Sequence, residues 1–400
     1  MSLNETVSAE RVHIGFFGRR NVGKSSLVNA VTGQALAVVS DVGGTTTDPV
    51  KKAMELLPIG PVLIIDTPGF DDEGALGELR VEKTREILAK TDIAVLVTDA
   101  AAPMYADERE MLALFSARGI PYLHVCNKAD SLDMVPAAEE HTVWVSAKNG
   151  TGITELKNRI GSLAKTKKND RFIVADLLSP KDTVVLVTPI DAAAPKGRLI
   201  LPQQQTLREI LDVHGQVFVC QDTELAGTFA ALREMPRMVI TDSQAFGRVA
   251  KDVPDEVPLT SFSILFARYK GNLRTLVSGA RMLSELRDGD RVLISEGCTH
   301  HRQCGDIGTV KLPALIHKFT GCTPAYTFTS GGTFPEDVSS YKLVIHCGGC
   351  MLNEAEMAHR MAAAAQSGTP IVNYGVAIAH MNGILKRSLS LFPDVLQLLS

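Results

Sequence analysis

Short apolar runs alternate with amphipathic stretches along most of the chain. In the N-terminal part, apolar runs cover residues 12–17, 62–65, 122–126 and 143–145. Short runs of this kind predict buried strands, and the amphipathic stretches between them predict helices. A polar, charged run at residues 164–171 has no apolar period, so we interpret it as a linker.

The same alternation resumes after the linker. Further strands are predicted at residues 183–190, 217–220, 238–240, 291–295 and 343–346. Helices are predicted at residues 204–213, 223–233 and 354–365. Strands that alternate with helices are typical of α/β proteins, so we expect this fold class throughout the chain.

Length and charge narrow the class of protein. A chain of 400 residues exceeds one typical domain, so we expect two or three. The formal net charge of −4 argues against a nucleic-acid-binding protein, whose affinity usually comes from a basic face. The sequence has no apolar leader and no apolar run long enough to cross a membrane, so we expect a soluble, cytoplasmic protein. Seven cysteines are too few for a disulfide scaffold and indicate free thiols, metal binding or redox chemistry.

Residues 18–25 form the pattern G-x-x-x-x-G-K-S between the first predicted strand and a probable helix. Such a loop cradles nucleotide phosphates, because its glycines let successive backbone N–H groups converge on phosphate oxygens. Lys24 is expected to reach the β- and γ-phosphates, and the Ser25 hydroxyl is expected to face Mg²⁺. The nucleotide-binding residues predicted here are Gly18, Asn21, Val22, Gly23, Lys24, Ser25 and Ser26.

Two later segments are expected to complete the phosphate and Mg²⁺ site. Thr45 and Thr46 offer hydroxyls in a loop, and Asp66 ends the second apolar run, three residues before Gly69. A carboxylate at this position can hold Mg²⁺ through water. The residues predicted to take part in hydrolysis are Lys24, Thr46, Asp66 and Gly69, and those predicted to hold Mg²⁺ are Ser25, Thr46 and Asp66.

Two further motifs indicate which base is bound. Asn127, Lys128 and Asp130 end the third apolar run, and Asp130 can accept hydrogen bonds from the guanine N1–H and amino group, which adenine does not offer. The last motif, Ser146, Ala147 and Lys148, follows the fourth run. In this order and spacing the motifs resemble the signature of the Era, Der and MnmE branch of GTPases, over about the first 165 residues. The predicted nucleotide is therefore GTP.

The resemblance to this branch has two further implications. An asparagine at the position of Asn21 marks members whose hydrolysis is assisted by K⁺, which neutralises developing charge where other GTPases use an arginine. The residue after the Asp-x-x-Gly motif is Phe70, which cannot orient a water molecule, so slow intrinsic hydrolysis is expected.

The last part of the chain, from about residue 263, holds five of the seven cysteines: Cys298, Cys304, Cys322, Cys347 and Cys350. Cys298 lies just past one predicted strand, and Cys347 and Cys350 lie just past another. If the two strands are parallel, their carboxyl ends open onto one crevice, where α/β sheets place ligands. Three thiolates that are distant in sequence would then meet in space.

Three kinds of chemistry fit this cysteine pattern. Zinc would take a fourth ligand, which His300 or His301 could supply. An iron–sulfur cluster held by three cysteines would leave one iron open to an exchangeable ligand. A thiol redox pair is the third interpretation, although the motif follows no thioredoxin-like pattern. The spacing alone leaves zinc and an iron–sulfur cluster equally favoured.

The whole chain resembles the HydF family of FeFe-hydrogenase maturation GTPases. The resemblance rests on the GTPase motifs, a small α/β segment, Cys298-Thr299-His300 and the later Cys347-Gly348-Gly349-Cys350. It implies that Cys298, Cys347 and Cys350 hold a 4Fe–4S cluster, with His300 as a possible fourth ligand. It also implies a homodimer formed by the middle domain. Cys304, an additional thiol near the site, and Pro68, where related GTPases commonly have alanine, depart from the pattern.

The resemblance further implies a carrier of a transient di-iron precursor. Its partners would be apo FeFe-hydrogenase and two radical-SAM maturases, with no nucleic acid and no membrane. We expect a P-loop GTPase domain at residues 1–165, a dimerisation domain at 172–262 and a cluster-binding domain at 263–400, the last two also α/β. The alternatives are an RNA-acting GTPase like Era or MnmE, which would need a basic accessory domain, and a zinc-stabilised regulatory GTPase.

Several other cysteines and histidines are expected to have no ligand role. Cys304 and Cys322 are interpreted as bystanders. His346 should point away from the cysteine crevice, because neighbouring side chains on a strand alternate between faces. The remaining residues expected to be structural are His214, Cys220 and His380.

Overall fold

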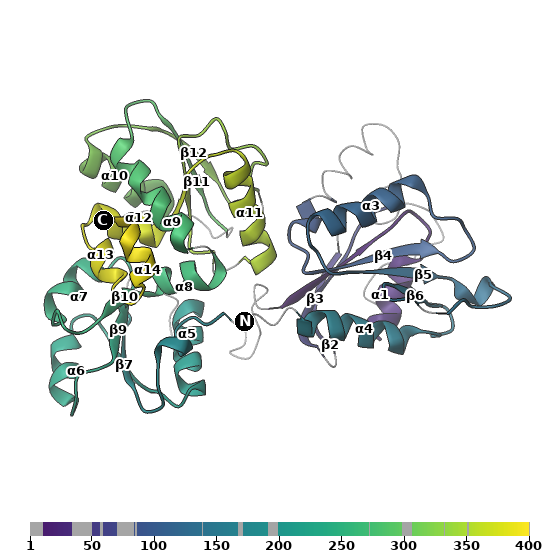
Figure 1. The fold of residues 1–400 in the computed structure, drawn as a ribbon, viewed down its shortest axis with the longest axis horizontal. Helices are drawn as coiled ribbons and strands as arrows, with labels where there is room; N and C mark the ends of the chain where they lie inside the picture. Colours follow the sequence, from purple (N-terminus) through teal and green to yellow (C-terminus); the bar gives the residue numbers. More distant parts are fainter. Residues whose placement is uncertain are drawn as a thin grey trace. The chain divides into compact units, whose positions relative to one another are not determined.

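The computed structural model describes residues 11–33, 50–56, 59–69, 84, 86–137, 139–166, 171–190, 199–271, 273–297, 306–331, 333–349 and 352–399. The chain divides into two compact units, Met1–Asn169 and Asp170–Ser400 (Figure 1). The division falls within the charged run at 164–171. The domain boundaries expected from sequence within the second unit stay predictions.

The first unit contains a six-stranded sheet with the order β2-β3-β1-β4-β5-β6. Strand β2 pairs antiparallel with β3, and the other neighbours are parallel. The strands are β1 (Val12–Phe17), β2 (Val50–Leu56), β3 (Gly60–Asp66), β4 (Ile93–Asp99), β5 (Tyr122–Asn127) and β6 (Thr142–Trp144). The helices in the described part of this unit include α1 (Lys24–Thr32), α3 (Ala106–Ala117), the short η2 (Ala129–Ser131) and α4 (Ile153–Thr166).

Both faces of this sheet are buried, which explains the continuous apolar runs of its central strands. Helices α1 and α4 cover one face, where Leu27 and Leu156 pack with Ile14. Helix α3 covers the other face, where Phe115 packs with Phe17. The three layers leave the carboxyl ends of the parallel strands β1, β3, β4 and β5 along one edge, where the loops of the candidate nucleotide site begin.

The second unit contains two four-stranded parallel sheets, in the orders β10-β9-β7-β8 and β12-β11-β13-β14. The first comprises β7 (Thr183–Val187), β8 (Gln216–Cys220), β9 (Met238–Thr241) and β10 (Leu259–Ser261), with helices η3 (Ala175–Leu177), α5 (Leu201–Asp212), α6 (Leu225–Ala231) and α7 (Phe246–Asp252). The second comprises β11 (Arg291–Ser295), β12 (Ala325–Thr329), β13 (Leu343–His346) and β14 (Ile371–Asn373).

The remaining helices of this unit follow or connect the strands of the second sheet. They are α8 (Phe262–Lys270), α9 (Leu273–Ala280), η4 (Arg281–Glu285), η5 (Ile307–Lys311), α10 (Leu312–Thr320), α11 (Glu354–Gln366), α12 (Tyr374–Met381), α13 (Leu385–Ser388), α14 (Pro393–Leu396) and η6 (Gln397–Leu399). Together, the mixed sheet of the first unit, the two parallel sheets of the second and their helices give the P-loop and α/β architecture expected from the sequence.

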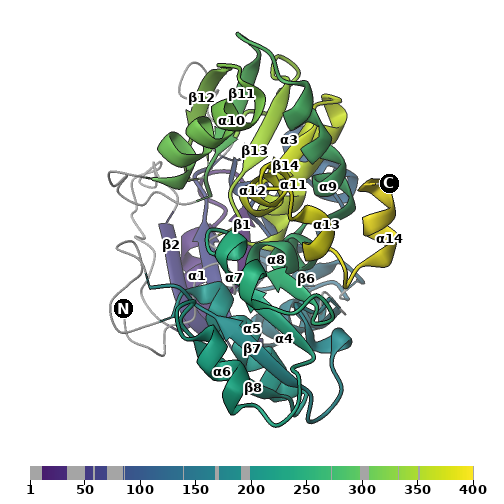
Figure 2. The same cartoon turned by 90° about the vertical axis from the view of Figure 1, so that its left-hand side faces the viewer.

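One hydrophobic core joins the two sheets of the second unit. Helices α8 and α12 lie between the sheets (Figure 2). Leu186 of one sheet and Val344 of the other belong to the same buried cluster as Phe266 of α8 and Val376 of α12. The opposite face of the first sheet has a separate core, in which Val185 packs with Phe246 of α7. The second unit is therefore built around α8 and α12.

Among the described residues, no helix is both long and apolar enough to span a bilayer.

Candidate functional site

The phosphate-binding loop lies between β1 and α1, and its backbone requires glycine at two positions. Gly18 and Gly23 have positive φ angles of 150° and 86°. A Cβ on Gly18 would lie 2.2 Å from the Val97 carbonyl oxygen, and one on Gly23 would lie 2.4 Å from Asn127 Nδ2. The loop can therefore approach β4 and β5 closely only because both residues lack a side chain.

Lys24 is bent back over this loop. Its side chain is buried, and Nζ donates hydrogen bonds to the carbonyl oxygens of Gly18, at 2.8 Å, and Arg19, at 2.6 Å. The ammonium is thus held against the loop itself, where it can compensate phosphate charge. Asn21 is exposed at the tip of the loop and has a φ of 60°, a conformation that asparagine tolerates better than most residues.

Ser25 and Asp66 form a corner suited to a hard divalent cation. Ser25 Oγ donates a 2.6 Å hydrogen bond to Asp66 Oδ2. Asp66 is 1% exposed, and its Oδ1 atom has no hydrogen-bond partner among the described residues. Burial raises the pKa of this carboxyl, while the Ser25 hydrogen bond and the Lys24 charge act in the opposite direction. A buried carboxylate oxygen beside a hydroxyl fits the oxygen ligands that Mg²⁺ prefers.

Asn127 connects two loops of the nucleotide corner. It is 2% exposed, its Nδ2 donates to the Val22 carbonyl oxygen at 2.9 Å, and its Oδ1 accepts from the Ala147 N–H at 3.0 Å. This side chain, predicted to bind nucleotide, therefore holds the phosphate loop and the Ser146 loop together. One side-chain amide therefore fixes the position of the loop with the predicted phosphate contacts relative to the loop with the predicted base contacts.

Asp130 is an ionised carboxylate whose position is fixed by a neighbouring serine. Ser146 Oγ donates to its Oδ1 at 2.6 Å, and this hydrogen bond is the main cause that lowers the pKa of Asp130. Lys148 Nζ lies 4.0 Å from Oδ2 and is otherwise largely exposed. The carboxylate therefore stays ionised near neutral pH, and the arrangement suits two donors on one edge of a guanine base.

Lys128 has a partner that we did not foresee from the sequence. Its Nζ donates to Asp99 Oδ2 at 2.7 Å, and the residue has a φ of 66°. Burial acts to raise the pKa of Asp99, but hydrogen bonds from Lys128 and the Ala101 N–H outweigh it, so the net pKa is lowered. The only sequence signal was that Asp99 ends an apolar strand, as Asp66 does.

The other predicted nucleotide residues are partly described. Ser26 lies in the first turn of α1, and Gly69 lies three residues past the end of β3. Thr45, Thr46 and Phe70 lie outside the described residues.

The second candidate site lies where β11 and β13 end. These strands are parallel, as expected, with Ser295 opposite His346. The next residue, Cys347, donates its N–H to the Ser295 carbonyl oxygen at 2.9 Å. The Cys347 sulfur accepts N–H groups from Gly297, at 3.0 Å, and Gly349, at 3.4 Å. The sulfur is therefore held by backbone donors from both strand ends.

Cys298, His300, Cys304 and Cys350 lie outside the described residues. Gly297 and Gly349, which directly precede Cys298 and Cys350 in sequence, are the two residues that donate to the Cys347 sulfur. Within the described part of the chain, no group of three or more metal-ligating side chains is gathered. Backbone N–H groups aimed at a sulfur fit a thiolate, and such bonds tune iron–sulfur clusters. The described residues fit a thiolate ligand at Cys347.

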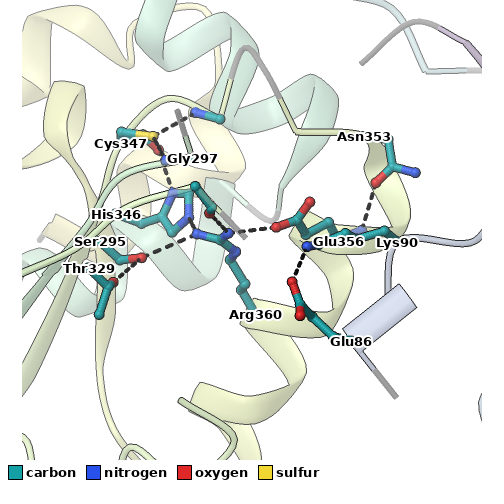
Figure 3. A network of polar contacts seen from close by, with 12 residues as sticks. Glu86, Lys90, Ser295, Gly297, Thr329, His346, Cys347, Asn353, Glu356 and Arg360 are labelled. Atoms are coloured by element: carbon teal, nitrogen blue, oxygen red, sulfur yellow. Dashed lines mark hydrogen bonds and ion pairs between the residues drawn. The ribbon is translucent and has the colours of Figure 1, made fainter. Parts of the chain in front are cut away.

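A buried arginine connects the strand ends beneath this sulfur (Figure 3). Arg360 of α11 is 0% exposed. Its Nη1 donates to Ser295 Oγ at 3.2 Å and contacts His346 Nε2 at 3.0 Å, and its Nη2 donates to the Gly331 carbonyl and to Glu356 Oε1, each at 2.6 Å. Arg360 thus ties β11, β13 and the loop after β12 to one helix. We did not predict this role, because one arginine on an amphipathic helix is usually exposed.

His346 belongs to this network, not to the cysteine crevice. It is 1% exposed, and its Nδ1 lies 2.6 Å from the Cys347 carbonyl oxygen. Burial, followed by the Arg360 charge, lowers the pKa of His346 to about 3, so the ring stays neutral. The expected structural role of His346 agrees with these contacts.

Tyr374 and Glu296 lie beside the same strand end. The Tyr374 hydroxyl donates to Glu296 Oε1 at 3.2 Å. Burial, and then the charge of Glu296, raise the pKa of this tyrosine, so it remains a neutral donor. A Cβ on Gly308 would lie 2.3 Å from the Tyr374 hydroxyl, so η5 approaches this pair closely.

The described bystander residues have local contacts. Cys322 Sγ lies 3.6 Å from the Thr320 carbonyl oxygen, and His380 Nε2 lies 3.2 Å from Ser284 Oγ. Burial raises the pKa of Cys220, which keeps it a thiol. His214 has a φ of 60° in the turn between α5 and β8.

Comparison with known families matches three parts of the chain. The hydrogen maturase F tetramerization domain matches residues 274–391, and the hydrogen maturase F dimerization domain matches residues 173–271. The 50S ribosome-binding GTPase family matches residues 13–128. The two maturase matches together account for most of the second unit.

Curated relatives and solved structures match the first part of the chain. The tRNA modification GTPase MnmE of Thiobacillus denitrificans is 34% identical over 152 residues, which cover 38% of this chain and 33% of that protein. The MnmE of Burkholderia cenocepacia is 35% identical over 164 residues, covering 39% and 35%. The chain thus spans about a third of the length of these relatives. The crystal structure of Aquifex aeolicus Era bound to GDP and aluminium fluoride has a TM-score of 0.35 at 19% identity, over 52% of this chain and 94% of that chain.

Proposed function

The chain belongs to the hydrogen maturase F (HydF) family, and from this membership we propose that it is a GTP-hydrolysing carrier in FeFe-hydrogenase maturation. In this proposal it holds a 4Fe–4S cluster through Cys298, Cys347 and Cys350. Its cargo is a di-iron precursor, which it delivers to apo-hydrogenase. GTP is bound and hydrolysed in the first unit, and the cluster is held in the second.

The observation that carries the cluster assignment is the environment of the Cys347 sulfur. Two backbone N–H groups, from Gly297 and Gly349, point at this atom. Each donor directly precedes another cysteine of the proposed set. Backbone donors stabilise the thiolate over the thiol, because they interact more strongly with the charged form. When bound, the cluster would supply an iron with an exchangeable ligand position, with His300 a candidate for that position.

The proposed hydrolysis uses the described corner of the first unit. Water attacks the γ-phosphorus, the bond to the β–γ bridging oxygen breaks, and GDP and phosphate leave. Lys24 would compensate the charge on the phosphate oxygens, Ser25, Thr46 and Asp66 would hold a Mg²⁺ that supplies further positive charge there, and the Gly69 N–H would donate to the γ-phosphate. Asp130 selects guanine. K⁺ beside Asn21 would supply further positive charge.

The association and location of the protein are also proposed. The dimerization-domain match supports a homodimer, and the tetramerization-domain match supports pairing of dimers. The proposed partners are apo FeFe-hydrogenase and the two radical-SAM maturases, in the cytoplasm.

The decisive experiment compares Cys347→Ser with Cys322→Ser. We expect the native protein, purified without oxygen and reconstituted with iron and sulfide, to be brown with full iron and sulfide content. Cys347→Ser should lose the cluster, since a hydroxyl is a poor ligand for iron. Cys322→Ser is the matched control and should keep it. A colourless native protein loaded with zinc, or full cluster content in Cys347→Ser, would contradict the proposal.

The carrier role needs a separate assay. The native protein loaded with the di-iron precursor should activate apo-hydrogenase, whereas loaded Cys347→Ser should not. The same assay with and without GTP tests whether nucleotide is required for delivery.

A further inference from the structure

A buried lysine lies against the loop that carries the Cys347 and Cys350 motif. Lys270 is the last residue of α8, and it is 8% exposed. Its Nζ donates to the carbonyl oxygens of Leu352, at 3.1 Å, and Gly349, at 3.4 Å. These two acceptors stand directly before and after residues 350 and 351 in the sequence, so the ammonium binds the described residues on both sides of that pair.

Gly349 connects this ammonium to the Cys347 sulfur. Its N–H donates to the sulfur, while its carbonyl oxygen accepts from Lys270. The residue has a φ of 65°, and a Cβ on it would lie 2.7 Å from Met357 Sδ. The backbone conformation therefore requires glycine. The N–H of Gly349 thus points at the Cys347 sulfur, and its carbonyl oxygen points at the Lys270 ammonium.

The position of Lys270 is set by the core and not by the loop alone. Ser261 caps the start of α8, where its Oγ accepts the Ile264 N–H at 3.3 Å. Ile264, Leu265 and Phe266 anchor the helix in the core that joins the two sheets. A charge in so dry a location is costly unless polar groups surround it, and its field is weakly screened there.

We infer that Lys270 is a positioning residue for the cluster: it holds Gly349, whose N–H donates to the Cys347 sulfur, together with Leu352, and it supplies a fixed positive charge next to the backbone that holds this sulfur. This inference rests on the proposed function. Lys270 lies within the segment matched as a dimerization domain, and its contacts lie in the segment matched as a tetramerization domain. A helix of one segment thus shapes the ligand loop of the other.

The test uses the full-length protein with reconstituted cluster and compares Lys270→Met, Lys270→Gln and Lys270→Arg. Removal of the charge should shift the reduction potential of the cluster to a more negative value, because the added electron loses a nearby cation. Iron release to a chelator should become roughly 10- to 100-fold faster in Lys270→Met, as for other residues that orient metal ligands. Lys270→Arg should retain the native potential.

Lys342→Met is the matched control, since this exposed lysine lies at the start of the same strand-and-loop segment, before β13. Far-ultraviolet circular dichroism shows which variants are folded; if Lys270→Met is not, Lys270→Gln provides the decisive comparison. A native potential and native iron release in a folded, uncharged variant would overturn the inference and leave the proposed function intact. A native protein without a cluster would overturn both.

Discussion

In the first unit the side chains expected to meet phosphate and Mg²⁺, namely Lys24, Ser25 and Asp66, are bonded to one another or to nearby carbonyl oxygens, whereas in the second unit the Cys347 sulfur is held by backbone N–H groups. Ser25 donates to Asp66, and Lys24 donates to its own loop. These bonds would exchange when phosphate and Mg²⁺ arrive. The bonds from Gly297 and Gly349 to the sulfur need not break when iron binds.

The difference suggests what a single substitution should do in each place. At the nucleotide site, Lys24 and Asp130 are expected to contact the nucleotide directly. Replacing either side chain should therefore change activity more than it changes stability. At the ends of β11 and β13, where Cys347 lies, the position of the sulfur depends on buried residues beneath it. Substitutions there should change stability or cluster retention and leave hydrolysis intact.

The largest expected effect is on stability, from Arg360→Met. The substitution leaves the buried Glu356 carboxylate without its partner and removes the bonds to Ser295 and Gly331. We expect the free energy of unfolding of the second unit to fall by about 3–5 kcal/mol, as when one partner of a buried pair is removed. Urea unfolding, followed by circular dichroism, measures it.

The control for this prediction is Arg208→Met. Arg208 and Asp212 form an ion pair with the same four-residue spacing, at 2.8 Å, but both are largely exposed. That substitution should cost at most about 0.5 kcal/mol. Equal losses in the two variants would show that burial of Arg360 does not matter.

The second effect is on turnover, from Lys24→Ala. Loss of the ammonium over the phosphate loop should lower the GTP hydrolysis rate by roughly 10²- to 10³-fold, the size expected for one preorganised charge-stabilising group. Lys51→Ala, an exposed lysine on β2, is the control. Phosphate release measures the rate, and cluster content should not change. A parallel loss of cluster would contradict the separation between the two sites.

The third effect is on base selection, from Asp130→Asn. The substituted amide places a donor opposite the guanine N1–H, so GTP affinity should fall about 10- to 100-fold, as for a lost hydrogen bond to a charged group. Xanthosine triphosphate should then bind better than GTP. Asp133→Asn, on the same exposed loop, is the control. Competition with a fluorescent nucleotide measures both affinities; equal binding of ATP and GTP by the native protein would refute the role of Asp130.

The smallest effect concerns the choice of monovalent cation. The native protein should hydrolyse GTP faster in KCl than in NaCl, and Asn21→Ala should remove this difference without abolishing hydrolysis. Asn158→Ala, on the exposed face of α4, is the control. Rates that do not depend on the cation in the native protein would remove K⁺ from the proposed mechanism and leave the GTPase assignment in place.

The sequence predicted the local features of both regions well. The apolar runs at 12–17, 291–295 and 343–346 are the strands β1, β11 and β13 with the same bounds, and the helix predicted at 354–365 is α11. These elements have strong periodic patterns and turn residues at their ends. The parallel order of β11 and β13 followed from the helices between strands.

The contacts that support the sites could not be predicted. Arg360, Lys270 and Asp99 act through partners that are distant in sequence or on other elements, and each looks like an ordinary charged residue in its own segment. Lys270 and Arg360 reach the residues around Cys347 only because α8 and α11 pack against the sheets. Local patterns identify reactive groups, but they do not identify what holds them.

The shared core between the two sheets of the second unit constrains the evolution of its sequence. The two family matches meet between residues 271 and 274, yet side chains from both sides of that point fill one interior. A chain cut there would leave two pieces, each with an uncovered apolar face. If one segment were replaced by that of a relative, its core side chains would pack poorly against the other segment. We therefore expect the two segments to be inherited as a pair, with compensating substitutions across α8 and α12.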